Sequence, residues 1–344
     1  MRRTLGAPIV VLLLALVGGC GEDSESSAAP ATERAGAGFP ATVEHKFGTT
    51  TVESEPKRIV VVGLTEQDTV LALGHKPIAT TEWYGDQPYA VWPWAREALG
   101  DAKPTVLSNA DGFEFEKIAQ LAPDLIIGTN AGMKREDYEK LSQIAPTVAG
   151  PEGGTEWFSP WDDQVRLISH ALGKADEGRK LIERVKSRYA EVAEAHPEFA
   201  RKTATFAQNG FYSGQLYVYP EGLNTEFLTY LGFEMNPKID ALPHKPGEQV
   251  GISEERLDTI DADVIVFATE KPADVTNFEK VPTFKHLDAV AENRAVYTDF
   301  NLAGAIYFMS PLSLEYALDR LVPQLQDAVD GKAPREMIDT TAAP

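Results

Sequence analysis

The sequence predicts an α/β protein of two lobes, each built around a mostly parallel sheet, with one long helix joining them. Three observations lead to this fold class: a helix–strand unit that occurs twice, continuous aliphatic runs that suit strands covered on both faces of a sheet, and a strand-free stretch between the two copies. The length of 344 residues falls between one large domain and two ordinary ones.

The repeated unit covers residues 116–127 and 255–266. Both copies carry an acid, a base and an aliphatic residue, then a further aliphatic residue, an aspartate and three consecutive aliphatic residues. We expect each copy to form a short helix that leads directly into a buried strand. Two looser pairs of segments occur in the same order, 70–74 with 227–232 and 141–148 with 287–297. This shared order favours a duplication of α/β units.

The stretch between the copies, residues 159–200, shows helical rather than strand periodicity. Apolar residues from Trp161 to Leu172 recur at helical spacing, and the pattern resumes over residues 176–196 until Pro197 ends it. A helix of about twenty residues extends roughly 30 Å, which suits a connection between two lobes. An ordinary surface helix in a single large domain is the alternative. The expected parts are a lobe over 43–173, a linking helix over 174–200, a lobe over 201–332 and a tail over 333–344.

The first residues predict an exported, lipid-anchored protein. Arg2 and Arg3 precede an apolar run, residues 5–17, that is too short to span a bilayer comfortably. Small residues then lead to Cys20, the only cysteine, in an arrangement that resembles a bacterial lipobox with Cys20 as the lipidated residue. The alternative is an ordinary secretory signal with an incidental cysteine. Residues 21–42, rich in Ser, Ala, Gly, Pro and Glu, predict a disordered tether.

The charge balance excludes some function classes. The formal net charge is −20, and removal of residues 1–19 with Arg2 and Arg3 makes it −22. A nucleic-acid-binding protein is not expected, because such proteins use clustered Lys and Arg to displace phosphate counterions. Attraction to an anionic membrane by charge alone is not expected either. The lipid anchor is therefore the only predicted contact with the membrane.

Two segments resemble one known family. Residues 56–62 resemble the first strand of the iron–siderophore and vitamin B12 periplasmic binding proteins, and residues 115–126 resemble the most recognisable motif of that family. The likeness covers about residues 43–330. It implies the class III architecture, in which two Rossmann-like lobes joined by a rigid helix close only slightly on a ligand. It further implies that the chain captures a ferric siderophore between the lobes and delivers it to an ABC permease. Haem and vitamin B12 remain alternative ligands.

The same resemblance assigns a permease-docking role to two acids. One acid on each lobe of such proteins docks into arginine pockets of the permease, and Glu116 and Glu255 match these positions. Two carboxylates on twin lobes would make a bivalent, salt-sensitive dock. Both acids also suit the first turn of a helix, where the helix dipole favours negative charge. Glu114 and Glu254 are close enough for the assignment to shift.

Candidate ligand contacts lie in the loops that follow the predicted strands, because open α/β sheets bind ligands beyond the carboxyl ends of their strands. Aromatic side chains there can cover the apolar faces of a bulky chelate, although each ring has packing as its alternative role. These loops contain few cations, which favours a neutral or cationic chelate over an anionic catecholate complex. The candidates are Glu66, Trp83, Tyr84, Asn130, Trp157, Trp161, Tyr212 and Phe300.

Neither a resident cofactor nor an enzymatic centre is predicted. The six histidines form no close pairs, so a site for a bare metal ion is not expected. No nucleophile elbow, P-loop or dinucleotide fingerprint occurs. A hydrolase with Glu66 and Glu270 as an acid/base pair, and a surface interaction protein, are the rival functions. The expected protein is a monomer on the extracytoplasmic face of the membrane.

Overall fold

The computed structural model describes residues 38–154, 157 and 159–341. The predicted signal peptide, the lipidation site Cys20 and most of the predicted tether lie outside the described residues. Within them, no helix combines the length and apolar character that a membrane crossing requires.

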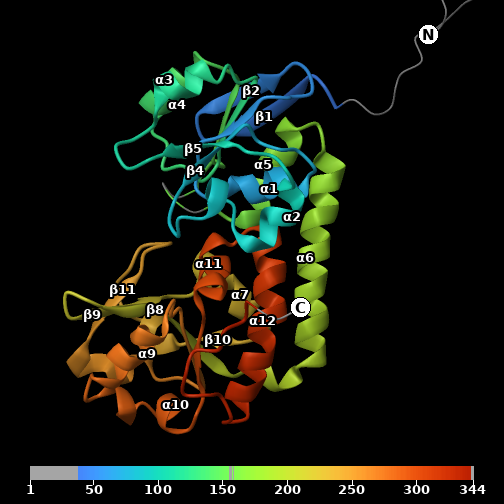
Figure 1. Ribbon diagram of the computed structural model, residues 1–344. Helices are drawn as coiled ribbons and strands as arrows, with labels where there is room; N and C mark the ends of the chain where they lie inside the picture. Colours follow the sequence, from blue (N-terminus) through green and yellow to red (C-terminus); the bar gives the residue numbers. More distant parts are fainter. Residues whose placement is uncertain (1–37, 155–156, 158, 342–344) are drawn as a thin grey trace, which may run out of the picture. The chain divides into compact units, whose positions relative to one another are not determined.

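The first lobe contains a five-stranded sheet in which every pairing is parallel (Figure 1). The connection that leaves β3 (Ile59–Val61) leads to β4 (Ala79–Glu82) on one side, and the connection that leaves β6 (Leu125–Gly128) leads to β7 (Thr147–Ala149) on the other, so the chain diverges between the neighbouring strands β3 and β6. Such a switch point opens a crevice at the carboxyl ends of the two diverging strands. In spatial order the strands are β5 (Thr105–Ser108), β4 (Ala79–Glu82), β3 (Ile59–Val61), β6 (Leu125–Gly128) and β7 (Thr147–Ala149).

Helices and a separate hairpin complete this lobe. The hairpin of β1 (Ala41–His45) and β2 (Gly48–Val52) buries alternate side chains, and β1 contacts α5. Strand β1 starts within the last two residues of the stretch predicted as a tether, because its apolar side packs into the core. The helices are α1 (Glu66–Ala72), α2 (Arg96–Leu99), α3 (Phe115–Gln120), α4 (Arg135–Ser142) and α5 (Trp161–Ala171), with short 3-10 turns at Pro88–Ala90 and Pro93–Ala95.

The second lobe contains a six-stranded sheet of mixed direction. Strand β8 pairs in parallel with β12 and β10, whereas the hairpin of β8 and β9 and the pairing of β9 with β11 are antiparallel. The strands are β8 (Thr203–Tyr212), β9 (Gln215–Tyr219), β10 (Glu234–Met235), β11 (Val250–Ser253), β12 (Val264–Phe267) and β13 (Ala295–Tyr297). The helices are α7 (Glu226–Thr229), α8 (Pro237–Asp240), α9 (Pro272–Glu279), α10 (Asp288–Ala291), α11 (Phe300–Phe308) and α12 (Pro311–Val329), with 3-10 turns at Pro197–Phe199, Leu223–Thr225, Glu254–Ile260 and Phe284–His286.

Both copies of the sequence repeat occupy equivalent places in the two sheets. Helix α3 leads into β6 in the first lobe, and the 3-10 segment Glu254–Ile260 leads into β12 in the second. The aspartate of each copy binds backbone groups at the start of the neighbouring strand in the sheet: Asp124 accepts hydrogen bonds from the backbone N–H groups of Lys57 and Arg58 beside β3, and Asp263 accepts one from that of Thr203 on β8. The α/β fold class predicted from the sequence is confirmed.

Helix α6 (Ala175–Ala195) runs along both lobes (Figure 1). It packs on α5 of the first lobe and on α12 of the second, and its buried side chains include Val185 and Tyr189. One apolar cluster continues through this contact, from Val165 on α5 to Leu314 on α12. The lobes therefore share a core in addition to the connecting helix.

A buried polar contact joins the same two lobes. Asp68 on α1 accepts hydrogen bonds through Oδ2 from Ser310 Oγ at 2.5 Å and from Trp94 Nε1 at 2.6 Å. Ser310 is the N-cap of α12, so the start of that helix is held against the first lobe. Asp68 Oδ1 is buried and has no hydrogen-bond partner among the described residues. Burial raises the pKa of Asp68 to about 7, although the two hydrogen bonds act in the opposite direction.

This contact predicts a specific pH dependence of stability. A carboxyl whose pKa is higher in the folded than in the unfolded protein stabilises the fold at low pH, and this contribution is lost as the pH rises through the folded-state value. We expect the free energy of unfolding to lose about 2–3 kcal/mol between pH 5 and 8 through Asp68 alone. In Asp68→Asn, which keeps an acceptor for Ser310 and Trp94, this part of the pH dependence should disappear from denaturant unfolding curves.

The exposed Asp111→Asn serves as the matched control and should keep the wild-type pH dependence. An Asp68→Asn protein with an unchanged slope between pH 5 and 8 would show that Asp68 stays ionised at the joint.

Candidate functional site

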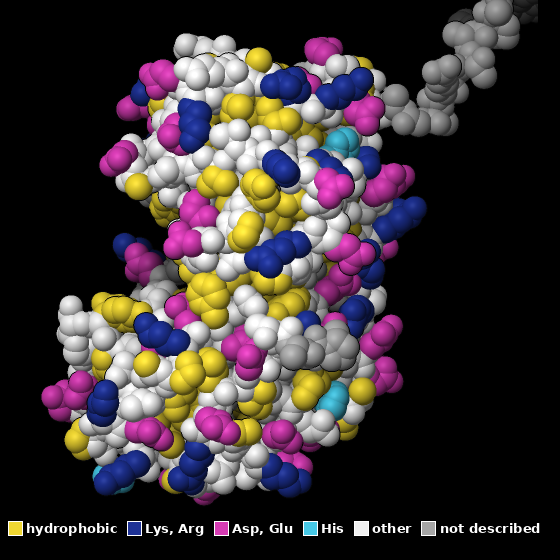
Figure 2. Space-filling model, viewed as in Figure 1, with side chains coloured by type: hydrophobic (Ala, Val, Ile, Leu, Met, Phe, Trp, Pro, Cys, Tyr) yellow, Lys and Arg dark blue, Asp and Glu magenta, His cyan; other side chains and the backbone are white. Residues whose placement is uncertain are grey.

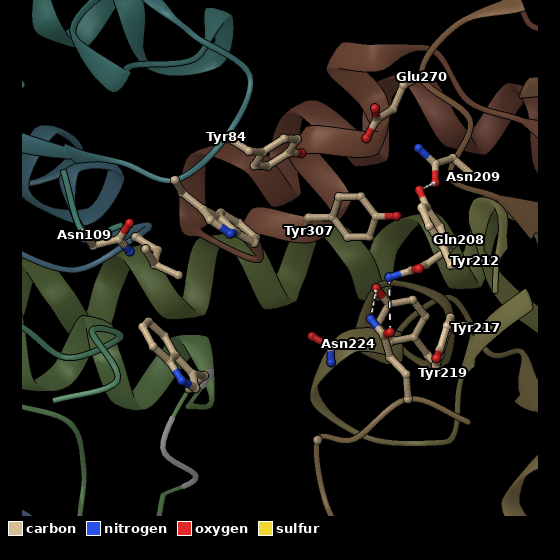
Figure 3. A pocket seen from close by; sticks show the side chains of 15 residues that line it. Tyr84, Asn109, Gln208, Asn209, Tyr212, Tyr217, Tyr219, Asn224, Glu270 and Tyr307 are labelled. Atoms are coloured by element: carbon tan, nitrogen blue, oxygen red, sulfur yellow. Dashed lines mark hydrogen bonds between the residues drawn. The ribbon is translucent and has the colours of Figure 1, made fainter. Parts of the chain in front are cut away.

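A cavity of about 700 Å³ lies between the two lobes. Its walls combine aromatic rings with neutral amide side chains, and residues of both lobes contribute (Figure 3). The lining consists of Leu64, Trp83, Tyr84, Asn109 and Trp157 from the first lobe and of Gln208, Asn209, Tyr212, Tyr217, Tyr219, Asn224, Gly247, Gln249, Glu270 and Tyr307 from the second.

In the first lobe, the loops after the parallel strands supply the wall. Trp83 and Tyr84 directly follow β4, and their rings meet edge to face with centroids 4.9 Å apart. The buried ring of Trp92 supports Tyr84 from behind at 5.1 Å. Trp157 is 40% exposed, and its ring lies so close to Gly132 that a Cβ there would be 2.1 Å from Trp157 Cζ2. The glycine therefore sets the place of this ring.

In the second lobe, the antiparallel hairpin of β8 and β9 supplies half of the lining residues. Tyr217 and Tyr219 are two residues apart on β9, so the alternation of a strand puts both rings on one face. Gln249 donates to the hydroxyl of Tyr219 at 2.7 Å, and Gln208 donates to Gln249 at 3.1 Å. These hydrogen bonds, drawn in Figure 3, hold the phenol and amide groups in fixed directions.

Tyr307 on α11 links the two walls. Its ring lies 6.2 Å from that of Tyr84 and 6.4 Å from that of Tyr219. Burial raises the pKa of Tyr307 and of Tyr84 well above the ordinary value of a phenol. Both hydroxyls consequently stay protonated at neutral pH and present O–H donors, and the buried hydroxyl of Tyr84 has no hydrogen-bond partner among the described residues.

The charges of the lining are few. Among its described residues, Glu270 is the one acid, and Arg, Lys and His are absent. On the face seen in Figure 2, acidic and basic side chains are interspersed over the outer surface. The cavity therefore offers neutral donors and aromatic faces with one carboxyl group.

Of the ligand contacts expected from the sequence, Trp83, Tyr84, Trp157 and Tyr212 line this cavity. Tyr212 is 49% exposed at the end of β8 and donates to Asn209 Oδ1 at 2.5 Å. The other four expected contacts, Glu66, Asn130, Trp161 and Phe300, do not line it.

Glu66 and Asn130 instead tie together the two loops at the switch point of the first sheet. The carboxylate of Glu66 accepts from the backbone N–H of Thr65 at 3.0 Å and from that of Asn130 at 2.5 Å. The Asn130 side chain donates to Thr65 Oγ1 at 3.0 Å. We call this set of hydrogen bonds between Thr65, Glu66 and Asn130 the clasp. Gly63 leaves room for it, since a Cβ at residue 63 would lie 2.0 Å from Glu66 Oε1. A fully buried Glu66 bonded in this way is not placed to act as an acid/base partner of Glu270 across the cleft.

Trp161 and Phe300 lie behind the walls. Trp161 is buried in the shared core at the start of α5. Phe300 is partly buried and packs on Trp92 with ring centroids 5.0 Å apart, and on Tyr84 at 6.3 Å. Phe300 therefore supports the aromatic layer that faces the cavity, whereas Trp161 belongs to the core that the lobes share.

Sequence reasoning missed several lining residues for identifiable reasons. Tyr217 and Tyr219 lie on an antiparallel hairpin, whereas ligand contacts were expected only in the loops at the carboxyl ends of parallel strands. Tyr307 is seven residues after Phe300, which is two helical turns along one face. The signals that would have found them are the alternating tyrosines of β9 and the helical spacing from Phe300.

Comparison with known proteins gives the family. The chain matches the family described as "Periplasmic binding protein" over residues 59–302. The "Probable siderophore-binding lipoprotein YfiY" of Bacillus subtilis is 29% identical over 286 residues, which cover 81% of this chain and 83% of that protein. The "Iron(3+)-hydroxamate-binding protein YxeB" of the same organism is 26% identical over 347 residues, covering 94% of this chain and 97% of that protein.

Solved structures that resemble this chain are also solute-binding proteins. A periplasmic solute binding protein from Mycobacterium smegmatis is 39% identical with a TM-score of 0.78, and the match covers 84% of this chain and 98% of that one. PiaA from Streptococcus pneumoniae in complex with ferrichrome is 26% identical with a TM-score of 0.72, covering 85% and 99%. The chain has the two-lobed architecture of a solute-binding protein. It belongs to the periplasmic binding protein family, whose members are binding proteins of transport systems rather than enzymes.

The hydrogen bonds of the clasp predict that replacing Glu66 costs stability, whereas replacing Asn109, a polar residue outside the clasp, does not. Glu66→Ala would leave the backbone N–H groups of Thr65 and Asn130 buried without an acceptor, so we expect the free energy of unfolding to fall by about 2–4 kcal/mol. Asn109→Ala, a cavity-lining control whose side chain is partly exposed, should change it by less than about 0.5 kcal/mol. Denaturant unfolding measures both. A Glu66→Ala protein that unfolds like wild type but loses ligand affinity would make Glu66 a ligand contact after all.

Proposed function

We propose that this protein is the substrate-binding component of an ABC importer, that it captures a ferric siderophore in the cavity between its lobes and that it delivers the complex to the permease. In this proposal it works as a monomer on the extracytoplasmic face of the membrane, anchored through a lipid on Cys20. The observation that carries the proposal is the cavity of about 700 Å³ lined by aromatic rings and neutral hydrogen-bond donors.

The chemistry of this lining suits an iron chelate. Ferric siderophores present an apolar or weakly polar skeleton around an oxygen-coordinated metal. Aromatic faces such as those of Trp83, Trp157 and Tyr212 can cover the skeleton, while the protonated hydroxyls of Tyr84 and Tyr307 can donate to ligand oxygens. The volume lies in the range of cavities that enclose small-molecule ligands.

The named relatives support the same class of ligand. A siderophore, an Fe(III)–hydroxamate complex and ferrichrome are the ligands named for YfiY, YxeB and PiaA, respectively. Haem and vitamin B12 remain the alternative ligands to be tested directly.

A fluorescence titration tests the ligand class. Trp83 and Trp157 line the cavity, so a bound ferric hydroxamate should quench tryptophan emission of the purified protein saturably, and its iron-free form should not. Ferric catecholates should bind at least about tenfold more weakly, because a highly anionic complex would meet no cation in the lining. Haem, vitamin B12 and zinc complete the panel, and saturable binding of one of these alone would replace the siderophore proposal.

Aromatic substitutions locate the binding event. Tyr212→Ala and Trp157→Ala remove half-exposed rings from the cavity, so each should weaken ferric hydroxamate binding about tenfold with little change in stability. The matched control is Tyr89→Ala, which removes a ring of 37% exposure outside the cavity and should leave the affinity unchanged. Isothermal titration calorimetry, which does not depend on the remaining tryptophans, measures all three.

We also propose that Glu116 and Glu255 dock the two lobes on the permease. Both side chains are exposed, and each lies in the first turn of the helical segment in its copy of the repeat. Their neighbour Glu114 accepts the backbone N–H of Ser108 at 2.8 Å and pairs with Lys117 at 3.1 Å. Glu114 is thus engaged within its own lobe, which favours Glu116 as the docking acid.

The docking proposal predicts that transport and binding separate. In Glu116→Ala/Glu255→Ala, uptake of a labelled ferric siderophore by cells should fall at least about tenfold, because both charged contacts are lost. Ligand affinity should not change, since neither side chain lines the cavity. A double variant at two other exposed acids, one on each lobe, Glu139→Ala/Glu279→Ala, should transport like wild type. Normal uptake by the Glu116/Glu255 variant would refute the docking roles.

A further inference from the structure

Glu270 is the acid of the cavity, and the fold presents it there directly. It lies three residues after β12 and two residues before α9. Its backbone N–H donates to Asp274 Oδ2 at 3.0 Å, which fixes the turn between strand and helix. Its side chain is partly buried, and Figure 3 shows the carboxylate near Asn209, on the side of the cavity toward which the hydroxyl of Tyr84 points.

No described cation neutralises this carboxylate. Glu270 forms no ion pair with a described residue. The adjacent Lys271 is exposed and borders a separate surface hollow beside the hairpin of β8 and β9, together with Asp274. Burial and the charge of Asp274 raise the pKa of Glu270, while Lys271 and hydrogen bonding to Asn209 act in the opposite direction.

A partly desolvated carboxylate without a counter-charge destabilises the empty cavity, and a positively charged ligand group would relieve this cost. An anionic group would add repulsion to it. The remaining lining is neutral and rich in donors, which suits uncharged ligand oxygens. A ferric trihydroxamate meets these conditions, because three hydroxamates with a single negative charge each neutralise Fe(III). A tris-catecholate complex does not, since it keeps a net negative charge.

Resting on the function proposed above, we infer that the ligand class is a ferric hydroxamate with a neutral iron centre and a protonated amine on its periphery, and that Glu270 is the residue that pairs with this amine. Glu270 then determines specificity within the hydroxamates, whereas the tyrosines, tryptophans and amides of the cavity hold the iron-bearing body that all of them share.

The test measures the affinity of wild type and of Glu270→Gln for each of two ligands. The ligands are a linear ferric trihydroxamate that ends in a primary ammonium group and the same complex with that amine acetylated. Wild type should bind the ammonium form about tenfold more tightly than the acetylated form, as expected for one charge-assisted hydrogen-bonded pair. In Glu270→Gln, which keeps the size of the side chain, the two forms should bind equally, and the affinity for the acetylated form should match that of wild type.

Two further variants make the outcome specific. Glu279→Gln removes an exposed acid at the end of α9, outside the cavity, and should keep the full preference. Glu270→Lys should reverse it in favour of the acetylated form. Thermal unfolding of each variant verifies that the fold is intact.

The possible results separate this inference from the proposed function. Equal binding of both forms by wild type, or a preference that persists in Glu270→Gln, would overturn the role of Glu270 and leave hydroxamate binding in place. Failure of wild type to bind either form would overturn the hydroxamate class, whereas the siderophore function proposed above is decided separately by the fluorescence panel.

Discussion

The packed joint between the lobes sets the relative positions of the two cavity walls. A single apolar cluster passes from α5 through α6 to α12, and the buried contact of Asp68 with Ser310 holds the start of α12 against the first lobe. Helix α11, which carries Tyr307, packs on α12. The position of this ring relative to the first lobe is thus set by a packed core rather than by a flexible connection. Because interiors are close-packed and resist deformation, the cavity is largely formed before a ligand enters, and less ordering free energy is lost on binding.

Within that frame, the residues that follow the strands divide into two kinds. Glu66 and Asn130 are buried at the switch point, where the carboxylate of Glu66 accepts from two backbone N–H groups and the side chain of Asn130 donates to the hydroxyl of Thr65. Tyr84 is supported from behind by Trp92 and Phe300 and has a hydroxyl without a hydrogen-bond partner among the described residues, and Trp83 lines the cavity beside it. The first kind ties the two loops together, and the second kind lines the cavity. Polar residues at strand ends in a switch-point fold therefore need not be ligand contacts, because the diverging loops have their own unpaired backbone groups to satisfy.

The same division accounts for which parts of the fold and of the cavity can be predicted from the sequence. The repeat and the helical stripe predict the α/β class and the helices α5 and α6, because periodicity and aliphatic runs report local structure and burial directly. The loops that follow the parallel strands yield Trp83, Tyr84 and Trp157 of the cavity, since strand ends are visible in the sequence. The hydrogen bond from the backbone of Asn130 to Glu66 joins residues far apart in the sequence. No local sequence pattern shows that the carboxylate of Glu66 is already bonded within the first lobe. The hairpin that brings Tyr217 to the wall has an antiparallel pairing that depends on tertiary context as well.

The electrostatics of the cavity indicate how a protein of strong net negative charge can still select a ligand. A net charge of −20 repels anionic chelates at long range, and the neutral lining offers them no counter-charge at short range. Rejection therefore relies on the cost of desolvating an unpaired ligand charge. Attraction needs only donors for neutral oxygens and aromatic area for the skeleton, and the tyrosines of the cavity provide both, since a phenol is protonated at neutral pH and burial raises the pKa of Tyr84 and Tyr307 further. One carboxylate added to such a lining changes the ranking of otherwise similar ligands more than an additional ring would, because a ring contacts all of them and a charge pairs with only some.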